Sequence, residues 1–300
     1  MTNKRHIGVP GVASSGGTAD GPGGARVTTV VMTRNRLDDL RRTLPRHTSP
    51  VILVDNGSVD GTVEYVRRTH PHIEVIALDR NLGAPARNLA VRQARTPLVA
   101  FADDDSWWAP GALKRAAGYF ASYPRLGVLA ARVLVGVPEL IDPVSAAMRT
   151  APLGRARDLP GPSVLGFIAC GAVVRRSAFL SVGGFDDVIG FAGEEERVAL
   201  DLAVARWGLA YADDVVAHHH PSAVRNRRER EIVVRRNRLL TALLRRRWST
   251  VAHEITTALR TPDGVRSLGA AAGSVPAALR QRAAIPPELE RTCRRLARLG

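Results

Sequence analysis

Short apolar runs that alternate with amphipathic stretches constrain the fold of this chain more than any other feature. The strand candidates are residues 27–32, 51–54, 75–78, 98–102 and 126–130, of which the first four are apolar runs of the buried type. The helix candidates between them are residues 37–44, 61–68, 85–94 and 110–120. Strands that alternate with helices predict an α/β fold with a mostly parallel, Rossmann-like sheet. Ligands of such sheets bind at the carboxyl ends of the strands.

The chain divides into three parts by composition. Residues 1–25 are rich in Gly, Ser, Thr and Ala without periodicity, so we expect them to be disordered. Residues 26–220 carry the α/β pattern, which continues with a run at 166–174, a helix around 194–207 and a strand near 211–218. Residues 221–300 form a basic, helical C-terminal region. With 300 residues and 45% hydrophobic composition, a disordered chain and a small disulfide-stapled module are excluded.

Cysteine content and hydropathy indicate the compartment. Only Cys170 and Cys293 occur, without the spacing of a metal site, which favours a reducing environment. The N-terminal 25 residues contain no apolar signal region, and no stretch reaches the roughly 18 apolar residues that a membrane span needs. We therefore expect a cytoplasmic protein.

The positive charge of the chain is concentrated at its C-terminal end. The formal net charge is +15, and residues 221–300 hold 18 arginines against 6 acidic residues. Such a density of arginine attracts phosphate, whether on nucleic acid, on anionic lipid or on a charged substrate.

Three adjacent carboxylates, Asp103, Asp104 and Asp105, follow the fourth predicted strand. Like charges this close repel one another unless a cation or solvent compensates them. Mg²⁺ and Mn²⁺ take oxygen ligands of this kind, together with substrate phosphates. An i, i+2 pair on extended backbone, Asp103 and Asp105, points to one face. The alternative is a solvated turn that caps the helix beginning near Pro110.

Polar groups also follow the first three predicted strands. The first is followed by Thr33-Arg34-Asn35-Arg36, and the second by Asp55-Asn56-Gly57-Ser58. Asp55 is placed to accept hydrogen bonds from a base or a ribose, or to form an ordinary Asx turn. After the third strand comes Asn81-Leu82-Gly83, and Arg87 follows in the early turns of the next helix. There it could meet a nucleotide phosphate or base edge, or lie on the surface.

Two further clusters lie in the second half of the chain. Glu194, Glu195 and Glu196 open a helix; the helix dipole accounts for some of these acids, and one is a candidate general base. His218-His219-His220 ends a strand, where one histidine is a candidate metal ligand or all three simply crowd a polar strand end. Trp107 and Trp108 could stack on a sugar or a lipid tail, or pack in the core.

These segments together resemble the family 2 glycosyltransferases of the GT-A type, over about residues 27–220. The resemblance rests on the order and spacing of the following motifs: Val30-Val31-Met32-Thr33-Arg34-Asn35-Arg36, Val54-Asp55-Asn56-Gly57-Ser58 with Asp60-Gly61-Thr62, Asn81-Leu82-Gly83 with Ala86-Arg87-Asn88, Phe101 to Asp105, Cys170-Gly171-Ala172, Gly183-Gly184-Phe185-Asp186 and Gly193-Glu194-Glu195. It implies a GT-A fold and a nucleotide-sugar site lined by Thr33, Arg34, Asn35, Asp55, Asn56, Gly83, Arg87, Asp103 and Asp104.

The resemblance also implies the metal and catalytic residues. Asp103 and Asp105 form the DXD-type pair for Mg²⁺ or Mn²⁺, with Asp105 nearest the cation and His218 beside it. Glu194 and Glu195 occupy the place of the family's Glu-Asp pair, whose second member is usually the catalytic base. Glu195 stands where aspartate is usual, and Arg197 where another acid is common.

The function expected on this basis is inverting transfer of a hexosyl or related sugar from a nucleoside-diphosphate sugar to an acceptor hydroxyl. The acceptor could be a glycan, a lipid-linked molecule or a small molecule. The alternatives are a non-catalytic protein on this fold that binds nucleic acid or anionic membrane, and a sugar nucleotidyltransferase, whose Gly-rich phosphate loop is absent.

The C-terminal region has two possible roles. In residues 232–244, Ile, Val and Leu recur at helical spacing among arginines, and Trp248 follows. Such a helix either attaches the enzyme peripherally to the anionic inner face of the membrane or packs on the catalytic domain. We expect no specific nucleic acid, since Trp248 is the one aromatic side chain available for stacking there.

Overall fold

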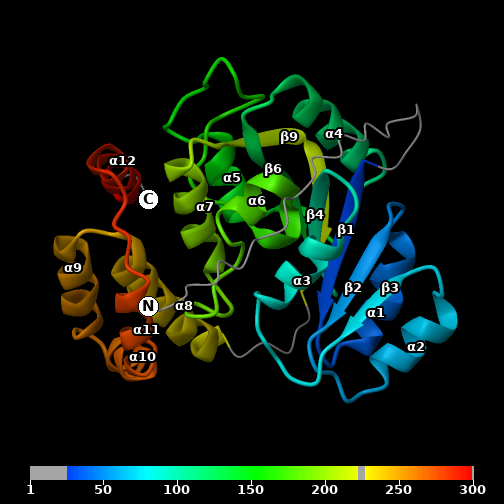
Figure 1. Ribbon diagram of the computed structural model, residues 1–300, viewed down its shortest axis with the longest axis horizontal. Coiled ribbons are helices and arrows are strands. Elements are labelled where there is room, and N and C mark those ends of the chain that lie inside the picture. The colour runs from blue at the N-terminus through cyan, green and yellow to red at the C-terminus, as the bar shows by residue number, and fades with distance from the viewer. Residues whose placement is uncertain (1–25, 222–226, 299–300) are drawn as a thin grey trace, which may run out of the picture.

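A computed structural model describes residues 26–221 and 227–298 of the chain, so the expected disorder of residues 1–25 lies outside the described residues. Within these ranges the protein is a mixed sheet covered by helices on both faces, with a helical C-terminal region on one side (Figure 1). The strands are β1 (Val27–Thr33), β2 (Val51–Asp55), β3 (Glu74–Ala77), β4 (Leu98–Asp103), β5 (Ser106–Trp108), β6 (Leu126–Val135), β7 (Leu140–Ile141), β8 (Ala172–Arg175) and β9 (Gly208–His219).

The strand order, β3-β2-β1-β4-β8-β6-β9-β5, confirms the expected α/β fold. The first four strands in this order are mutually parallel, as the alternation of strands and helices predicts. β8 then runs antiparallel between β4 and β6, and β9 pairs in parallel with β6. Because β5 pairs antiparallel with the end of β9, the segment after the aspartates lies against the histidine cluster.

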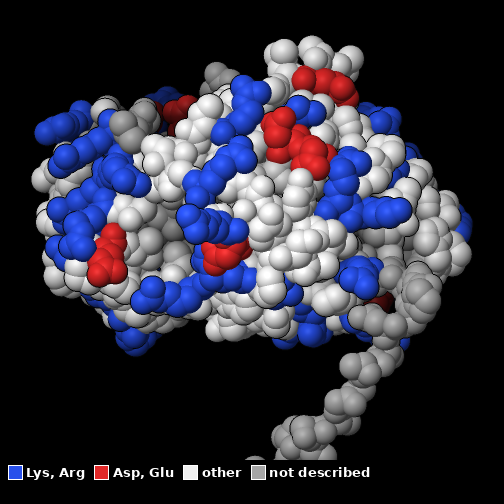
Figure 2. All heavy atoms as spheres, turned by 90° about the horizontal axis from the view of Figure 1, so that it is seen from above, with Lys and Arg blue, Asp and Glu red and all other residues white. Residues whose placement is uncertain are grey.

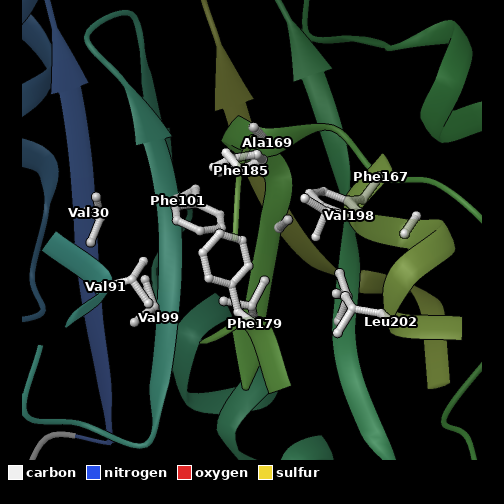
Figure 3. Close-up of a cluster of buried hydrophobic side chains, with 14 of the residues drawn as sticks. Val30, Val91, Val99, Phe101, Phe167, Ala169, Phe179, Phe185, Val198 and Leu202 are labelled. Atoms are coloured by element: carbon white, nitrogen blue, oxygen red, sulfur yellow. The ribbon is translucent and has the colours of Figure 1, made fainter. Parts of the chain in front are cut away.

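Helices cover the two faces of the sheet. Those of the α/β part are α1 (Leu37–Thr43), α2 (Thr62–Thr69), α3 (Ala86–Gln93), α4 (Ala112–Ser122), α5 (Pro143–Arg149), α6 (Arg176–Ser181) and α7 (Glu194–Val204), with short 3-10 turns η1 (Leu44–Arg46) and η2 (Ala169–Gly171). α3, α6 and α7 pack on one face, and α1, α2 and α4 pack on the other. The core of the first face centres on Phe101, Phe179 and Phe185, whose ring centroids lie 5.2–5.5 Å apart (Figure 3).

The C-terminal region is helical, as expected. It consists of α8 (Arg227–Arg245), α9 (Trp248–Ala258), α10 (Pro262–Ala272), α11 (Val275–Arg280) and α12 (Pro287–Ala297), and α9 lies on its outer side (Figure 1). The predicted apolar stripe of α8 is largely internal: Leu239, Leu240, Leu243 and Leu244 are buried in a cluster that includes Val188 and Ile189 of the α/β part. Of the two roles left open by the sequence, packing on the α/β part is therefore present in the structure.

The arginines of α8 also take part in this packing. Arg245 pairs with Asp201 of α7, and Arg246 lies 2.9 Å from Glu290 and 3.7 Å from Glu196. Basic side chains remain numerous on the surface, and Figure 2 shows them gathered over the C-terminal helices at the left of the view. None of the helices among the described residues is both long and apolar enough to cross a membrane.

Candidate active site

A cavity of about 540 Å³ opens at the carboxyl ends of β1 and β4, where a parallel sheet places its ligands. It extends from the ends of β1, β2 and β3, past the aspartates after β4, to the start of α7 and the first turns of α8. The predicted residues that line it are Thr33, Arg34, Asn56, Gly83, Arg87, Asp103, Asp104, Glu194 and Glu195. Segments far apart in the sequence thus meet around one space.

Arg87 lies at the centre of this site. Its side chain is only 1% exposed, and it pairs with Asp103 at one end and lies 3.5 Å from Glu194 at the other. It therefore joins α3, β4 and α7, and the predicted surface alternative does not apply. A buried guanidinium between two carboxylates offsets part of the negative charge of the site.

The three aspartates occupy different environments. Asp103 lines the cavity, and its Oδ1 accepts a hydrogen bond from Arg87. Asp104 accepts a hydrogen bond from Thr33 at 3.1 Å; burial, then the charges of Asp105 and Asp103, raise the pKa of Asp104 to about 8. Asp105, predicted to lie nearest the cation, is 2% exposed and does not line the cavity.

The structure brings His219, rather than the predicted His218, to the carboxylates. Ligand atoms of Asp103, Cys170 and His219 lie within 4.8 Å of one another, and Asp105 Oδ1 lies 3.3 Å from His219 Nε2. His218 points to the other face of β9, where its Nδ1 lies 2.9 Å from Glu139 and its ring stacks on Trp107. Side chains alternate along a strand, so the one-residue difference places the two imidazoles on opposite faces.

These residues fit a divalent cation. A carboxylate and an imidazole are ligands that Mn²⁺ accepts, and Asp103 and His219 can offer them in the cavity. Burial raises the pKa of the Cys170 thiol well above its ordinary value, so this sulfur is a neutral and poor ligand for a hard cation.

The two glutamates at the start of α7 differ in exposure and in partners. Glu194 is 3% exposed; burial, then the charge of Glu195, raise its pKa to about 8 against the effect of Arg87. At neutral pH Glu194 therefore holds a proton and accepts a hydrogen bond from Arg87, and above pH 8 the two form an ion pair. Glu195 is half-buried, lines the cavity, and its Oε1 accepts a hydrogen bond from the amide of Ala169 at 3.2 Å. Burial also raises the pKa of Glu195, which brings it closer to the range of a general base.

The predicted nucleotide residues form the other end of the cavity. Asn56 donates to the carbonyl of Gly83 at 3.0 Å and accepts from the amide of Leu82 at 2.7 Å, which ties the loops after β2 and β3 together. Gly83 has a φ of +68°, and a Cβ there would lie 3.1 Å from the backbone of Gly190, so a side chain is excluded.

Two predicted residues, Asn35 and Asp55, do not line the cavity. Asn35 bridges to the next loop. Its backbone N–H donates to the hydroxyl of Ser58, and its side-chain oxygen accepts from the backbone N–H of Val59. Asp55 forms the Asx turn, accepting from the amide of Ser58 at 2.9 Å. Its Oδ1 is buried without a hydrogen-bond partner in the described ranges.

The two tryptophans after the aspartates serve the fold. Trp108 is 5% exposed and donates to the carbonyl of Phe101 at 3.2 Å. The ring of Trp107 is covered by Arg46, His218 and His220. Of the two alternatives, core packing holds for Trp108, and Trp107 already has stacking partners.

Sequence reasoning missed one wall of the cavity. Phe191, in the loop before α7, and Glu229, Arg230 and Val233, on α8, all line it. No local pattern marks these residues, because they reach the site through the packing of α8 against α7.

Comparisons with known proteins agree with this geometry. The family model described as glycosyl transferase family 2 matches residues 28–183. The chain resembles a Pyrobaculum calidifontis mannosyltransferase, PcManGT, solved with GDP-Man and Mn²⁺. The TM-score is 0.54 and the identity 23%, over 85% of this chain and 72% of that one. The chain also resembles S. aureus TarS residues 1–349, solved with UDP-GlcNAc. The TM-score is 0.56 and the identity 17%, over 83% of this chain and 81% of that one.

The fold is also shared with GalNAc-T7 bound to UDP, GalNAc and Mn²⁺, with a TM-score of 0.54 at 12% identity, over 73% of this chain and 47% of that chain. No curated protein matches the sequence. The structural likenesses establish a GT-A fold, and the family model covers more than half of the chain, including every strand from β1 to β8. The chain therefore belongs to glycosyl transferase family 2.

Proposed function

We propose that this enzyme transfers a sugar from a nucleoside-diphosphate sugar to an acceptor hydroxyl, with inversion at the anomeric carbon. The observation that carries the proposal is the composition of the cavity, in which Glu195 borders the same space as Asp103 and its partner Arg87. A base for the acceptor and positive charge for the leaving group are what such a displacement requires. The relatives solved with GDP-Man and with UDP-GlcNAc support a nucleotide-sugar donor.

In this proposal Glu195 takes the proton of the acceptor hydroxyl. The acceptor oxygen then forms a bond to the anomeric carbon while the bond from that carbon to the diphosphate oxygen breaks, and the diphosphate leaves with the electron pair. Arg34 and Arg36, which line the donor end, bind the diphosphate. The amide of Ala169 holds the Glu195 carboxylate in place.

We propose that Asp103 and His219 hold a divalent cation, with Asp105 orienting His219. When bound, the cation supplies positive charge to the departing diphosphate. Mn²⁺ accompanies the nucleotide ligands in two of the similar structures, the mannosyltransferase and GalNAc-T7.

The proposed membrane contact belongs to α9 rather than to the leucines of α8. Trp248, Ile255 and Leu259 are 59%, 37% and 59% exposed, and their spacing of seven and four residues places them on one face of α9. Arg247 and Arg260 flank this stripe in the sequence. An exposed apolar stripe with adjacent positive charge is typical of peripheral attachment to anionic lipid.

A donor screen tests the proposed activity. Full-length protein is heated with each of a panel of nucleotide-sugars, with and without Mn²⁺, and the stabilising donor is then assayed for hydrolysis and transfer. We expect one donor to raise the midpoint of unfolding only when Mn²⁺ is present, and NMR of the product to show an inverted anomeric centre. Stabilisation by nucleotide without any metal dependence would contradict the cation site, and a retained configuration would contradict the mechanism.

Family membership favours this enzyme over a binding protein on the same fold. Several arginines that suggested a nucleic-acid or lipid-binding tail are instead paired with carboxylates of this chain: Arg238 with Glu254, Arg245 with Asp201 of α7 and Arg246 with Glu290. A sugar nucleotidyltransferase would instead release pyrophosphate from a nucleoside triphosphate and a sugar phosphate, and a pyrophosphate assay with these two substrates would detect it.

A further inference from the structure

The wall of the cavity beyond Glu195 comes from the C-terminal region. Phe191 and Val233 are 44% and 37% exposed and both border the cavity, so apolar surface faces the space there. The arginines and aspartates of the donor end line the same cavity from the α/β part of the chain. Phe191 lies only four residues before Glu195, so in the proposed reaction we assign this wall to the part of the acceptor that does not react.

α8 fixes the loop that carries Phe191. The buried amide of Asn237 donates to the carbonyls of Phe191 at 2.7 Å and Ala192 at 2.8 Å, and Arg236 donates to Ile189 at 3.1 Å. The same loop leads directly into Glu194 and Glu195. The wall and the base are thus held in one arrangement, so a molecule that contacts the first can be positioned for the second.

Arg230 differs from most of the arginines that follow it. Arg236 binds backbone carbonyls, and Arg238, Arg245 and Arg246 each pair with a carboxylate, whereas Arg235 is exposed outside the cavity. Arg230 lies over the ring of Phe191, 6.0 Å from its centroid, and pairs with no carboxylate in the parts of the chain that the structure describes. It is exposed and borders the cavity, so its charge is available to a ligand there.

We propose that Phe191, Val233 and Arg230 form an acceptor subsite for a molecule that carries a negative charge beside an apolar group. Phe191 and Val233 contact the apolar part, and Arg230 binds the anion, which is a phosphate or a carboxylate. The assignment of this subsite to the acceptor rests on the proposed glycosyl transfer, whereas the binding test below does not.

Three aryl glycosides serve as probes of the subsite: phenyl β-glucoside and its para-carboxylate and para-phosphate derivatives. Their dissociation constants are measured by ligand-observed NMR on full-length protein, with and without Mg²⁺ and the nucleoside diphosphate that stabilises the protein most. We expect the better of the two anionic probes to bind about fivefold more tightly than the neutral one, as for an ion pair in a partly exposed site. Comparison of the two anionic probes identifies the preferred anion. Added salt should reduce the difference in affinity between the anionic probes and the neutral one.

Arg230→Gln should abolish this preference and leave the affinity for the neutral probe unchanged. Arg235→Gln is the matched control, because Arg235 is an exposed arginine of α8 outside the cavity. Phe191→Ala should weaken all three probes alike. The proposal is overturned if the wild-type protein binds the neutral probe as well as the anionic ones, if it binds none, or if Arg230→Gln keeps the preference. Failure of the proposed glycosyl transfer would appear separately, as loss of the metal-dependent donor effect.

Discussion

Replacement of Arg87 by methionine should destabilise the protein by an amount that increases with pH. Arg87 is 1% exposed and offsets the charges of Asp103 and Glu194. Loss of the pair with Asp103, whose side chain is 27% exposed, costs about 1–2 kcal/mol at any pH at which Asp103 is charged. The pH dependence comes from Glu194, whose pKa in the folded protein is raised to about 8.

When folding raises the pKa of a carboxyl, the protein loses stability as the pH rises from the pKa of that carboxyl in the unfolded chain to its pKa in the folded protein. In the wild type this loss ends near pH 8, because Glu194 then ionises beside Arg87. Without Arg87 the pKa of Glu194 rises further and the loss continues. At one unit above pH 8 the additional destabilisation is about 1.4 kcal/mol.

Urea unfolding followed by far-UV circular dichroism at pH 6 and pH 9, without divalent cations, measures this difference. The double variant Arg87→Met, Glu194→Gln is the control, because it has no carboxyl at position 194 and should lose that part of the additional pH dependence, while the part from Glu195, whose pKa Arg87 also lowers, stays. A destabilisation by Arg87→Met that is equal at the two pH values would refute the charge balance inferred for Arg87 and Glu194.

Three other predictions concern catalysis, pH and membrane binding. Glu195→Gln should leave donor stabilisation intact and reduce turnover by roughly 10²-fold; if Glu194→Gln is the inactive variant instead, the base assignment is off by one residue. Burial lowers the pKa of His47 to about 4. As the pH decreases, His47 therefore binds a proton in the unfolded chain before it does so in the folded protein, and stability should fall by about 3 kcal/mol between pH 6.5 and pH 4. His47→Phe should remove this dependence in urea unfolding, and an unchanged pH profile would contradict it. Full-length protein should co-sediment with anionic liposomes at low salt and the double variant Trp248→Ala, Leu259→Asp should not; equal partitioning of the two would exclude α9 as the contact.

The sequence contained enough local information to predict the strands and the residues at their carboxyl ends. Apolar runs and turn residues are short-range signals, and the parallel arrangement of β1, β2 and β4 brings Thr33, Asn56 and Asp103 to one edge whatever the rest of the chain does. The aspartate triplet was informative for the same reason, since its mutual repulsion requires no knowledge of distant residues.

The remaining features depend on contacts between distant segments. Which histidine faces Asp103 is decided by the register of β5 with β9, in which Ser106 pairs with His219. A register is a tertiary property, and a shift of one residue exchanges the two faces. The role of Arg87 depends on Glu194, 107 residues later. The charge of the C-terminal region could be counted from the sequence, but its internal pairs, such as Arg245 with Asp201, could not.

The attachment of α8 to α7 has a consequence for how this enzyme could diversify. The nucleotide end of the cavity is encoded by residues up to Asp104, whereas the wall with Phe191 and Val233 is encoded after Ile189, so the two can vary separately as long as His219 and Glu194 of the later block are kept opposite Asp103 and Arg87. A chimera that exchanges residues 189–298 as one block would keep Asn237 with the loop it holds and Arg245 with Asp201. A junction placed at Pro221 would separate both pairs. Recombination of relatives at residue 189 should therefore produce folded hybrids with the donor choice of one parent and the acceptor choice of the other.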